Sequence, residues 1–269
     1  MLGDQSGLVS YEVIGAVARI SLNRPERRNA QGQLLLDEFN EALERGGRDP
    51  DIRAVILAAH GDHFSAGHDL KEAGTRPDGL EQRYAYEERR YMGYCMNLWD
   101  FPKPTIAQVQ GGCIAAGFML ANMCDLMVAS EDAFFADPTC LTLAAAAVEV
   151  LVHPWVMGLR AAKGFLFTGR KMFADEALRI GMINAVVSRA ELEEETLKLA
   201  VQTTKAPPFA MKMLKRSLNR TADFQGFRNA INAHFDTHVL THTTQEFKSI
   251  RNGGLENAIT NAKNIAKEH

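Results

Sequence analysis

The chain has 269 residues, of which 46% are hydrophobic, and its formal net charge is −3 at pH 7. This hydrophobic content is ample for a buried core, and the slightly acidic balance argues against a general polyanion-binding surface, so we expect no nucleic-acid partner. No apolar run approaches the roughly 20 residues that span a bilayer, so we expect no membrane partner either.

The cysteines and the first residues indicate a compartment. The four cysteines include no Cys-x-x-Cys pair, and residues 1–5 lack the basic and apolar regions of a signal peptide. The sequence therefore predicts a reduced, cytoplasmic location.

The first half of the chain alternates strand-like and helical patterns. Residues 11–14 and 16–22 are typical of short strands joined at Gly15, and apolar residues recur at helical spacing in 34–43. Further strand-like runs lie at 55–58, 105–109, 126–129 and 183–187. Helical segments separate these runs, which is the pattern of parallel β–α units, so we predict an α/β fold.

The last part of the chain is predicted to be helical. From about residue 189 onward no strand is evident. Helical patterns run through 191–203, 209–218, 223–242 and 255–267. Pro207 and Pro208 separate the first two of these segments, and together the four form a helical layer.

Two strand-to-helix junctions stand out. In residues 103–120 an apolar strand breaks at Gly111 and Gly112 and restarts as a helix, and the apolar run 53–59 is followed by a second junction in 63–72. The first N–H groups of a helix lack an intrahelical partner, so a small-residue start lets a ligand oxygen approach them. Two such junctions are able to supply two donors to one developing oxyanion.

The same two junctions carry a family resemblance. Residues 64–70 read Phe-Ser-Ala-Gly-His-Asp-Leu, and residues 103–111 read Lys-Pro-Thr-Ile-Ala-Gln-Val-Gln-Gly. With the Leu-Asn-Arg-Pro turn in 20–30, these blocks resemble the crotonase (enoyl-CoA hydratase/isomerase) superfamily in order and separation. Further matching blocks lie at 124–130, 166–170, 174–177 and 181–184.

The resemblance implies a fold and an assembly. The α/β core, residues 1–200, is expected to be a crotonase-like spiral of repeated ββα units with a CoA-thioester site. Residues 201–269 are expected to form a C-terminal helical trimerisation region that also covers the pocket. The partner copies would make a homotrimer or a dimer of trimers.

The resemblance also implies an oxyanion hole and a CoA site. The backbone N–H groups of His68 and Ala116 would bind the thioester carbonyl oxygen, and Gly67 and Gly117 would permit the close approach. The candidate CoA-binding residues are Arg27, Arg28, Ala66, Gly67, Asp69, Leu70 and Gly117. Coenzyme A would enter as part of an acyl-CoA or enoyl-CoA substrate, with no permanently bound cofactor.

The acid–base groups depart from the family pattern. Hydratases of the family carry two glutamates, and this chain has Met119 and Thr139 at those positions. Neither side chain transfers a proton in the useful pH range, so the two-carboxylate addition of water cannot run unchanged. Single-carboxylate Δ3,Δ2-isomerases usually keep the acid at the second position, so they lose support as well.

Glu149 is the candidate substitute. It stands among alanines and valines, close to where some crotonases carry a catalytic aspartate. An apolar setting would raise the pKa of this carboxyl towards proton-transfer duty, which makes Glu149 a tentative acid or base. A structural salt bridge or a solvent-facing position is the alternative.

The remaining candidates concern the acyl pocket and metals. Met119, Thr139 and Trp155 are expected to line the acyl pocket, although large apolar residues at these spacings are ordinary core by default. His60, His63 and His68 lie in a loop at irregular spacing. His234, His238 and His242 share one helical face, but i to i+8 spans about 12 Å, too far for one ion, so we expect no metal and a polar face or subunit contact instead.

Together these observations predict an enzyme, a hydratase/isomerase-like lyase or isomerase of fatty acid metabolism. It would bind an acyl- or enoyl-CoA thioester and stabilise its enolate. Two alternatives stay open: an acyl-CoA-binding paralogue without catalysis, and a CoA-thioester hydrolase or dehalogenase that uses a carboxylate.

Overall fold

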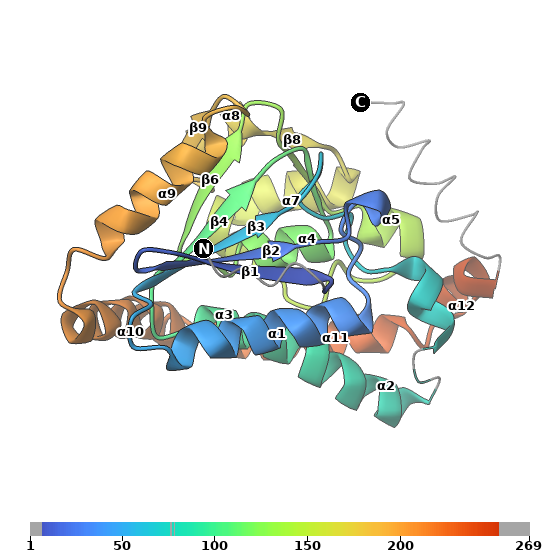
Figure 1. Ribbon diagram of the computed structural model, residues 1–269. Helices are drawn as coiled ribbons and strands as arrows, with labels where there is room; N and C mark the ends of the chain where they lie inside the picture. Colours follow the sequence, from blue (N-terminus) through green and yellow to red (C-terminus); the bar gives the residue numbers. More distant parts are fainter. Residues whose placement is uncertain (1–6, 76, 78, 253–269) are drawn as a thin grey trace.

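The computed structural model describes residues 7–75, 77 and 79–252. Its larger sheet has the strand order β1-β2-β3-β4-β6-β9 (Figure 1). These strands are β1 (Val9–Ile14), β2 (Val17–Leu22), β3 (Ala54–Ala59), β4 (Thr105–Val109), β6 (Leu126–Ser130) and β9 (Ala185–Val187). Among these six strands, the β1–β2 pair is antiparallel and the other neighbouring pairs are parallel. Gly15, at the turn between β1 and β2, has φ +60°. The α/β prediction is therefore confirmed.

A smaller sheet was missed by the sequence patterns. It contains β5 (Gly112–Ile114), β7 (Phe134–Ala136) and β8 (Met172–Phe173), paired in that order. Each of these strands has only two or three residues, too few for an alternating pattern to show. An isolated bridge between Ser65 and Cys113 ties the loop after β3 to this sheet. The small sheet thereby holds the two predicted junctions side by side.

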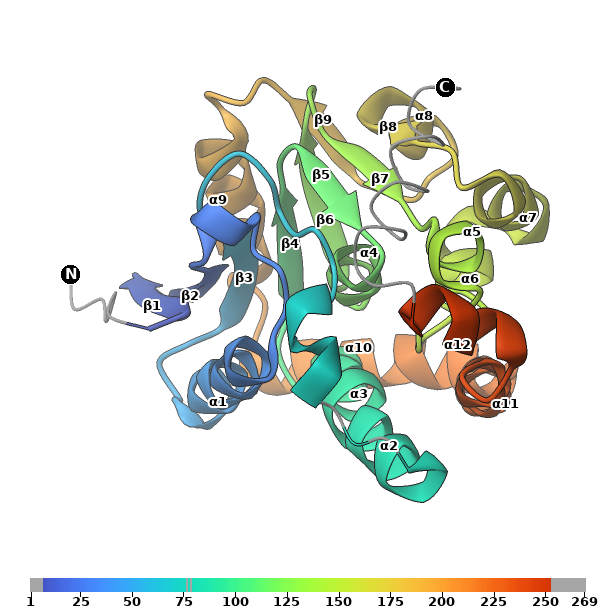
Figure 2. The ribbon, with the colours of Figure 1, turned by 90° about the vertical axis from the view of Figure 1, so that its right-hand side faces the viewer.

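Helices wrap both sheets (Figures 1 and 2). Up to the end of the small sheet they are α1 (Gln33–Arg48), α2 (Leu80–Glu87), α3 (Tyr94–Trp99), α4 (Ala116–Ala121), α5 (Thr139–Leu143), α6 (His153–Met157) and α7 (Leu159–Thr168). After it come α8 (Ala174–Arg179), α9 (Leu192–Thr203), α10 (Pro208–Phe224), α11 (Phe227–Thr241) and α12 (Gln245–Asn252). Short irregular turns are η1 (Pro25–Arg27), η2 (Leu70–Thr75) and the π-helical η3 (Glu88–Gly93).

The large sheet is covered on both faces. Helix α9 packs on one face, where Leu192 and Ala200 meet Ile56 and Ile106 in a small apolar cluster. The main core fills the other face, beneath α1, α3 and α4 (Figure 2). This coverage explains why the central strands are continuous apolar runs rather than alternating patterns.

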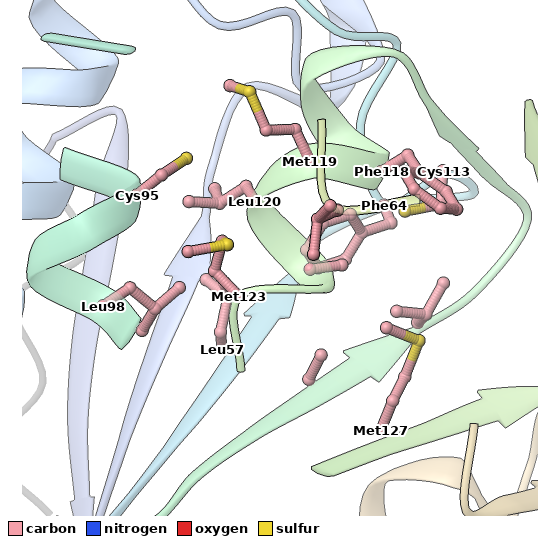
Figure 3. Close-up of a cluster of buried hydrophobic side chains, with 14 of the residues drawn as sticks. Leu57, Phe64, Cys95, Leu98, Cys113, Phe118, Met119, Leu120, Met123 and Met127 are labelled. Atoms are coloured by element: carbon pink, nitrogen blue, oxygen red, sulfur yellow. The ribbon is translucent and has the colours of Figure 1, made fainter. Parts of the chain in front are cut away.

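Helix α4 is buried at the centre of the main core. Its side chains Phe118, Met119 and Leu120 are all enclosed. Figure 3 shows Met119 and Leu120 on the same side of the core as Cys95 of α3. This packing fixes α4, and with it the backbone of the second junction.

The C-terminal helical layer differs in detail from its prediction. The pattern in 223–242 is split because α10 extends to Phe224 and Gly226 has φ +106°, a conformation that interrupts a helix. Helix α12 was not expected, and the segment 255–267 lies outside the described residues. Among the described helices, none has the length and apolar character needed to cross a membrane.

Candidate active site

Two glycines allow the two junctions to touch. A Cβ added at Gly67, whose φ is +87°, would lie 3.0 Å from the Ile114 carbonyl oxygen and 3.3 Å from the Ala116 nitrogen. A Cβ added at Gly117 would lie 2.8 Å from both the Cβ and the carbonyl oxygen of Ser65. The loop before His68 and the start of α4 are therefore in direct backbone contact.

The contact leaves two N–H groups available. Ala115 precedes α4 with φ +49°, an uncommon conformation for a residue with a Cβ, and its own N–H donates to the Ala136 carbonyl at 2.8 Å. Among the described residues, neither the N–H of His68 nor that of Ala116 has an acceptor. Both predicted oxyanion donors are thus free to bind a ligand oxygen.

The turn in 23–31 is bonded to the His68 loop. The Gln31 N–H donates to the Gly67 carbonyl at 2.8 Å, and the Ala66 N–H donates to the Arg28 carbonyl at 2.9 Å. The structure therefore brings the predicted CoA-binding segments together. Arg27 and Arg28 have exposed side chains beside this loop.

Asp69 and Arg24 anchor the same loop. The Arg24 guanidinium donates to Asp69 Oδ2 at 2.7 Å, and the Lys71 N–H donates to Asp69 Oδ1 at 2.9 Å. Although burial alone would raise it, the pKa of Asp69 is lowered by these hydrogen bonds and by the Arg24 charge. The Asp69 side chain is therefore used to hold the loop, and Leu70 begins η2 directly after it.

His68 and Glu149 meet across 81 residues of chain. Glu149, on the segment between α5 and α6, is only 4% exposed, and the His68 Nε2–H donates to its Oε2 at 3.0 Å. The other carboxylate oxygen, Oε1, lies 3.6 Å from His238 Nε2 on α11. The His68 ring stacks on Tyr91, with ring centroids 3.9 Å apart. A buried carboxylate thus lies between two imidazoles, beside the oxyanion loops.

The electrostatics of Glu149 correct one expectation. Sequence reasoning expected an apolar environment to raise its pKa. Burial does act in that direction, but the charge and hydrogen bond of His68 and the nearby His238 outweigh it and hold the pKa of Glu149 well below its ordinary value. Glu149 is therefore an ionised carboxylate at neutral pH.

Met119 and Thr139 have structural contacts. Met119 Sδ accepts a hydrogen bond from the Val150 N–H at 3.3 Å. The N–H and hydroxyl of Thr139 both donate to Asp137 Oδ1, and Asp137 Oδ2 lies 3.3 Å from His153 Nε2 in a fully buried pair. Both positions are thus filled by groups that support the local backbone.

The site includes residues that the sequence did not single out as functional. His238 and Tyr91 contact the His68–Glu149 pair, and Arg24 holds Asp69. The periodicity placed His238 on a helix face, but it gave no sign of which element that face would meet. Trp155 is 36% exposed and packs edge-to-face on Phe227 of α11 at 5.3 Å, so its role in the acyl pocket stays a prediction.

Sequence comparisons place the chain among known proteins. The sequence model described as Enoyl-CoA hydratase/isomerase matches residues 12–258. A Mycobacterium tuberculosis relative that carries the name enoyl-CoA hydratase EchA13 is 39% identical over 255 residues, 87% of this chain and 80% of the relative. The human mitochondrial Delta(3,5)-Delta(2,4)-dienoyl-CoA isomerase is 34% identical over 218 residues, 77% of this chain and 66% of the relative.

Solved structures give the same answer for the fold. An enoyl-CoA hydratase/isomerase from Xanthobacter autotrophicus Py2 has a TM-score of 0.88 at 36% identity, covering 94% of this chain and 96% of that one. A Mycobacterium smegmatis structure described as an enoyl-CoA hydratase has a TM-score of 0.84 at 46% identity, covering 87% and 94%. The chain therefore belongs to the enoyl-CoA hydratase/isomerase family and has the crotonase fold.

Proposed function

We propose that this protein binds an acyl- or enoyl-CoA thioester and moves the proton at the carbon next to the thioester carbonyl. The observation that carries the proposal is the buried contact of His68 Nε2 with Glu149 Oε2, 3.0 Å, on the same residue whose backbone N–H is free. His68 would therefore contribute its backbone N–H to the oxyanion and its side chain to the pair with Glu149.

The backbone would stabilise the developing negative charge. The thioester carbonyl oxygen would accept hydrogen bonds from the N–H groups of His68 and Ala116. As the α proton leaves, charge moves onto this oxygen, and one well-placed donor is worth about 2.7–4 kcal/mol. Side-chain identity matters little for this step, because only backbone atoms take part.

Glu149 would take the proton. It starts ionised because His68 and His238 face it. The hydrogen bond from His68 orients the carboxylate for this step. Return of the proton to another carbon completes an isomerisation. If a group is added to the substrate or lost from it before the proton is returned, the result is a lyase reaction.

Coenzyme A would lie along the loop 66–70. Backbone groups of this loop would take the adenine, and the exposed Arg27 and Arg28 would take phosphate groups. No further cofactor is needed for this chemistry. For assembly we propose a homotrimer or a dimer of trimers, supported by the exposed apolar residues Phe209 and Leu218 of α10.

An acyl-CoA-binding protein without catalysis is the second candidate. Met119 and Thr139 favour it, because both positions that hold glutamates in hydratases are engaged in structural contacts. A third candidate is a hydrolase or dehalogenase in which the Glu149 carboxylate acts as the nucleophile. The same test distinguishes it from the other two.

The test is incubation in deuterium oxide with a panel of saturated and enoyl-CoA thioesters, followed by mass spectrometry. We expect deuterium at the α carbon or an added water with the natural protein. Glu149→Gln should abolish this while leaving CoA-ester affinity nearly unchanged, and the exposed-site control Glu44→Gln should behave as the natural protein.

Other outcomes assign the alternatives. Tight thioester binding without exchange for any chain length would support the binding protein. A covalent acyl-enzyme mass after rapid quench would support the nucleophilic reaction. Full exchange by Glu149→Gln would remove Glu149 from the mechanism.

A further inference from the structure

A second buried polar cluster lies between α2 and α11. One donor atom from each of Glu87, His238 and His242 lies within 4.8 Å of the other two, and all three residues are buried. We propose that these three residues bind one divalent cation of the Zn²⁺ class. The reasons lie in how each side chain is held.

Glu87 presents one oxygen to the cluster. Its Oε1 accepts a hydrogen bond from Arg83 Nε at 2.8 Å, whereas its Oε2 is buried and has no hydrogen-bond partner among the described residues. The residue is 0% exposed. A carboxylate oxygen in this situation is costly unless something cationic meets it, and the bond to Arg83 orients the carboxylate as outer partners of metal ligands do.

His238 presents one nitrogen to the same place. Its Nδ1 lies 3.0 Å from the Ala147 carbonyl oxygen, which only accepts, so Nδ1 carries the hydrogen. The residue is 2% exposed, and within the part of the chain that the structure describes its Nε2 has no hydrogen-bond partner. Imidazoles that bind metals typically donate their other N–H to a carbonyl or a carboxylate in this way.

His242 follows His238 by one helical turn. Its Nδ1 lies 3.6 Å from Glu87 Oε2, and the two histidine rings have centroids 4.5 Å apart. Donors around a tetrahedral Zn²⁺ lie about 3.3–3.5 Å apart, given bonds of about 2.0–2.1 Å, so small side-chain rotations bring the three atoms into range. Glu149 Oε1, 3.6 Å from His238 Nε2, or a water is placed to fill a fourth position.

A cation bound by neutral imidazoles would meet two buried carboxylates, Glu87 and Glu149, of which Glu87 is bonded to Arg83. The cation would replace a proton on the imidazoles, so binding should release protons and strengthen as the pH rises.

The proposed ligands differ from the three histidines, His234, His238 and His242, that the sequence analysis considered as a metal site and rejected. His234, the third histidine of that face, turns away, because its Nε2 donates to the Val148 carbonyl at 2.8 Å. Glu87 comes instead from α2, a distant part of the chain. The helical spacing alone could not supply this ligand.

The experiment is calorimetric titration with Zn²⁺ in the absence of any CoA ester, after chelator treatment and dialysis. We expect one bound equivalent and a rise in the thermal unfolding midpoint, because the cation ties α2 to α11. Glu87→Gln and His242→Asn should each weaken binding by roughly tenfold or more and abolish the midpoint shift.

Two control variants test other zinc-binding side chains of the protein. His234→Gln tests the neighbouring histidine, and Cys140→Ser tests an exposed thiol able to bind zinc adventitiously. Both should bind as the natural protein does. Absence of binding, or equal binding by Glu87→Gln and His242→Asn, overturns the proposal; if one variant does not fold, the other decides. Because no thioester is present, the result is independent of the proposed function.

Discussion

The sulfur of Met119 accepts a hydrogen bond from the N–H of Val150, the residue directly after Glu149, at 3.3 Å. The family resemblance predicts that Met119 stands where hydratases carry their first glutamate. The Met119 side chain therefore helps to hold the backbone next to Glu149.

Met119→Leu tests the sulfur contact. The swap nearly conserves volume but leaves the buried Val150 N–H without its acceptor, so we expect the free energy of unfolding to fall by about 1–3 kcal/mol. Met119→Ala, which leaves a cavity, should cost about 2–5 kcal/mol. Urea denaturation measures both. If Met119→Leu abolished α-deuterium exchange as Glu149→Gln is expected to do, the side chain would have a role beyond packing.

Gly117→Ala should damage both stability and binding. The added methyl would meet Ser65 at 2.8 Å and force the two oxyanion loops apart. We expect a loss of about 1–3 kcal/mol in unfolding free energy and weaker binding of a CoA thioester. Gly164→Ala in α7 is the matched control, because its added methyl meets nothing within 4 Å. It should stabilise the protein by about 0.5–1 kcal/mol without changing thioester affinity.

Asp137 should make stability depend on acid pH. Burial alone would raise its pKa, but His153 and Thr139 lower it below its ordinary value. A lowered folded-state pKa gives stability that is complete above the unfolded-state pKa, about 3.9, and is lost as the pH falls through the folded-state value.

The comparison is denaturant unfolding of the natural protein and Asp137→Asn across this range. The natural protein should be the more stable above about pH 3.9, since breaking a buried pair costs about 3–5 kcal/mol. Its advantage should shrink as the pH falls. An advantage that stayed constant down to the acid limit would show that Asp137 carries no charge in the fold.

Asp69→Ala should loosen the CoA-binding loop. The substitution removes the bonds from Arg24 and from the Lys71 N–H, and hydrogen bonds to charged groups contribute about 1.5–3 kcal/mol. We expect a loss of stability of that size and a higher dissociation constant for the CoA ester. The exposed Asp51→Ala serves as control. Equal affinity in both variants would argue against a positioning role.

Much of the fold could be predicted from local pattern. Strands β3, β4 and β6 are buried on both faces, so they stand out as apolar runs of normal strand length. The short β5, β7 and β8 gave no period to detect. The break at Gly226 was missed because the apolar spacing continues across it, although its backbone conformation does not.

The site was predictable only where glycine spacing or motif fixed it. Gly67 and Gly117 were singled out at the two junctions, and the structure shows that a Cβ at either place has no room. The pKa of Glu149 was expected to be raised, but it is lowered. Its neighbours in sequence are apolar, and they gave no sign that His68 and His238 contact it in the fold. The contact with His238 depends on how α11 packs, and the contact with His68 depends on the loop before η2. Periodicity specifies neither arrangement.

The anchoring of residues 147–149 has a consequence for synthesis. The carbonyls of Ala147 and Val148 are bonded by His238 and His234, which lie 91 and 86 residues further along the chain. During translation, the last strand of the large sheet, β9, is synthesised before α11. Until then the segment lacks both tethers, and its carboxylate lacks one of its two imidazoles. A chain cut short before α11 should thus keep the contact between its two strand-to-helix junctions while the segment that carries Glu149 stays without these tethers.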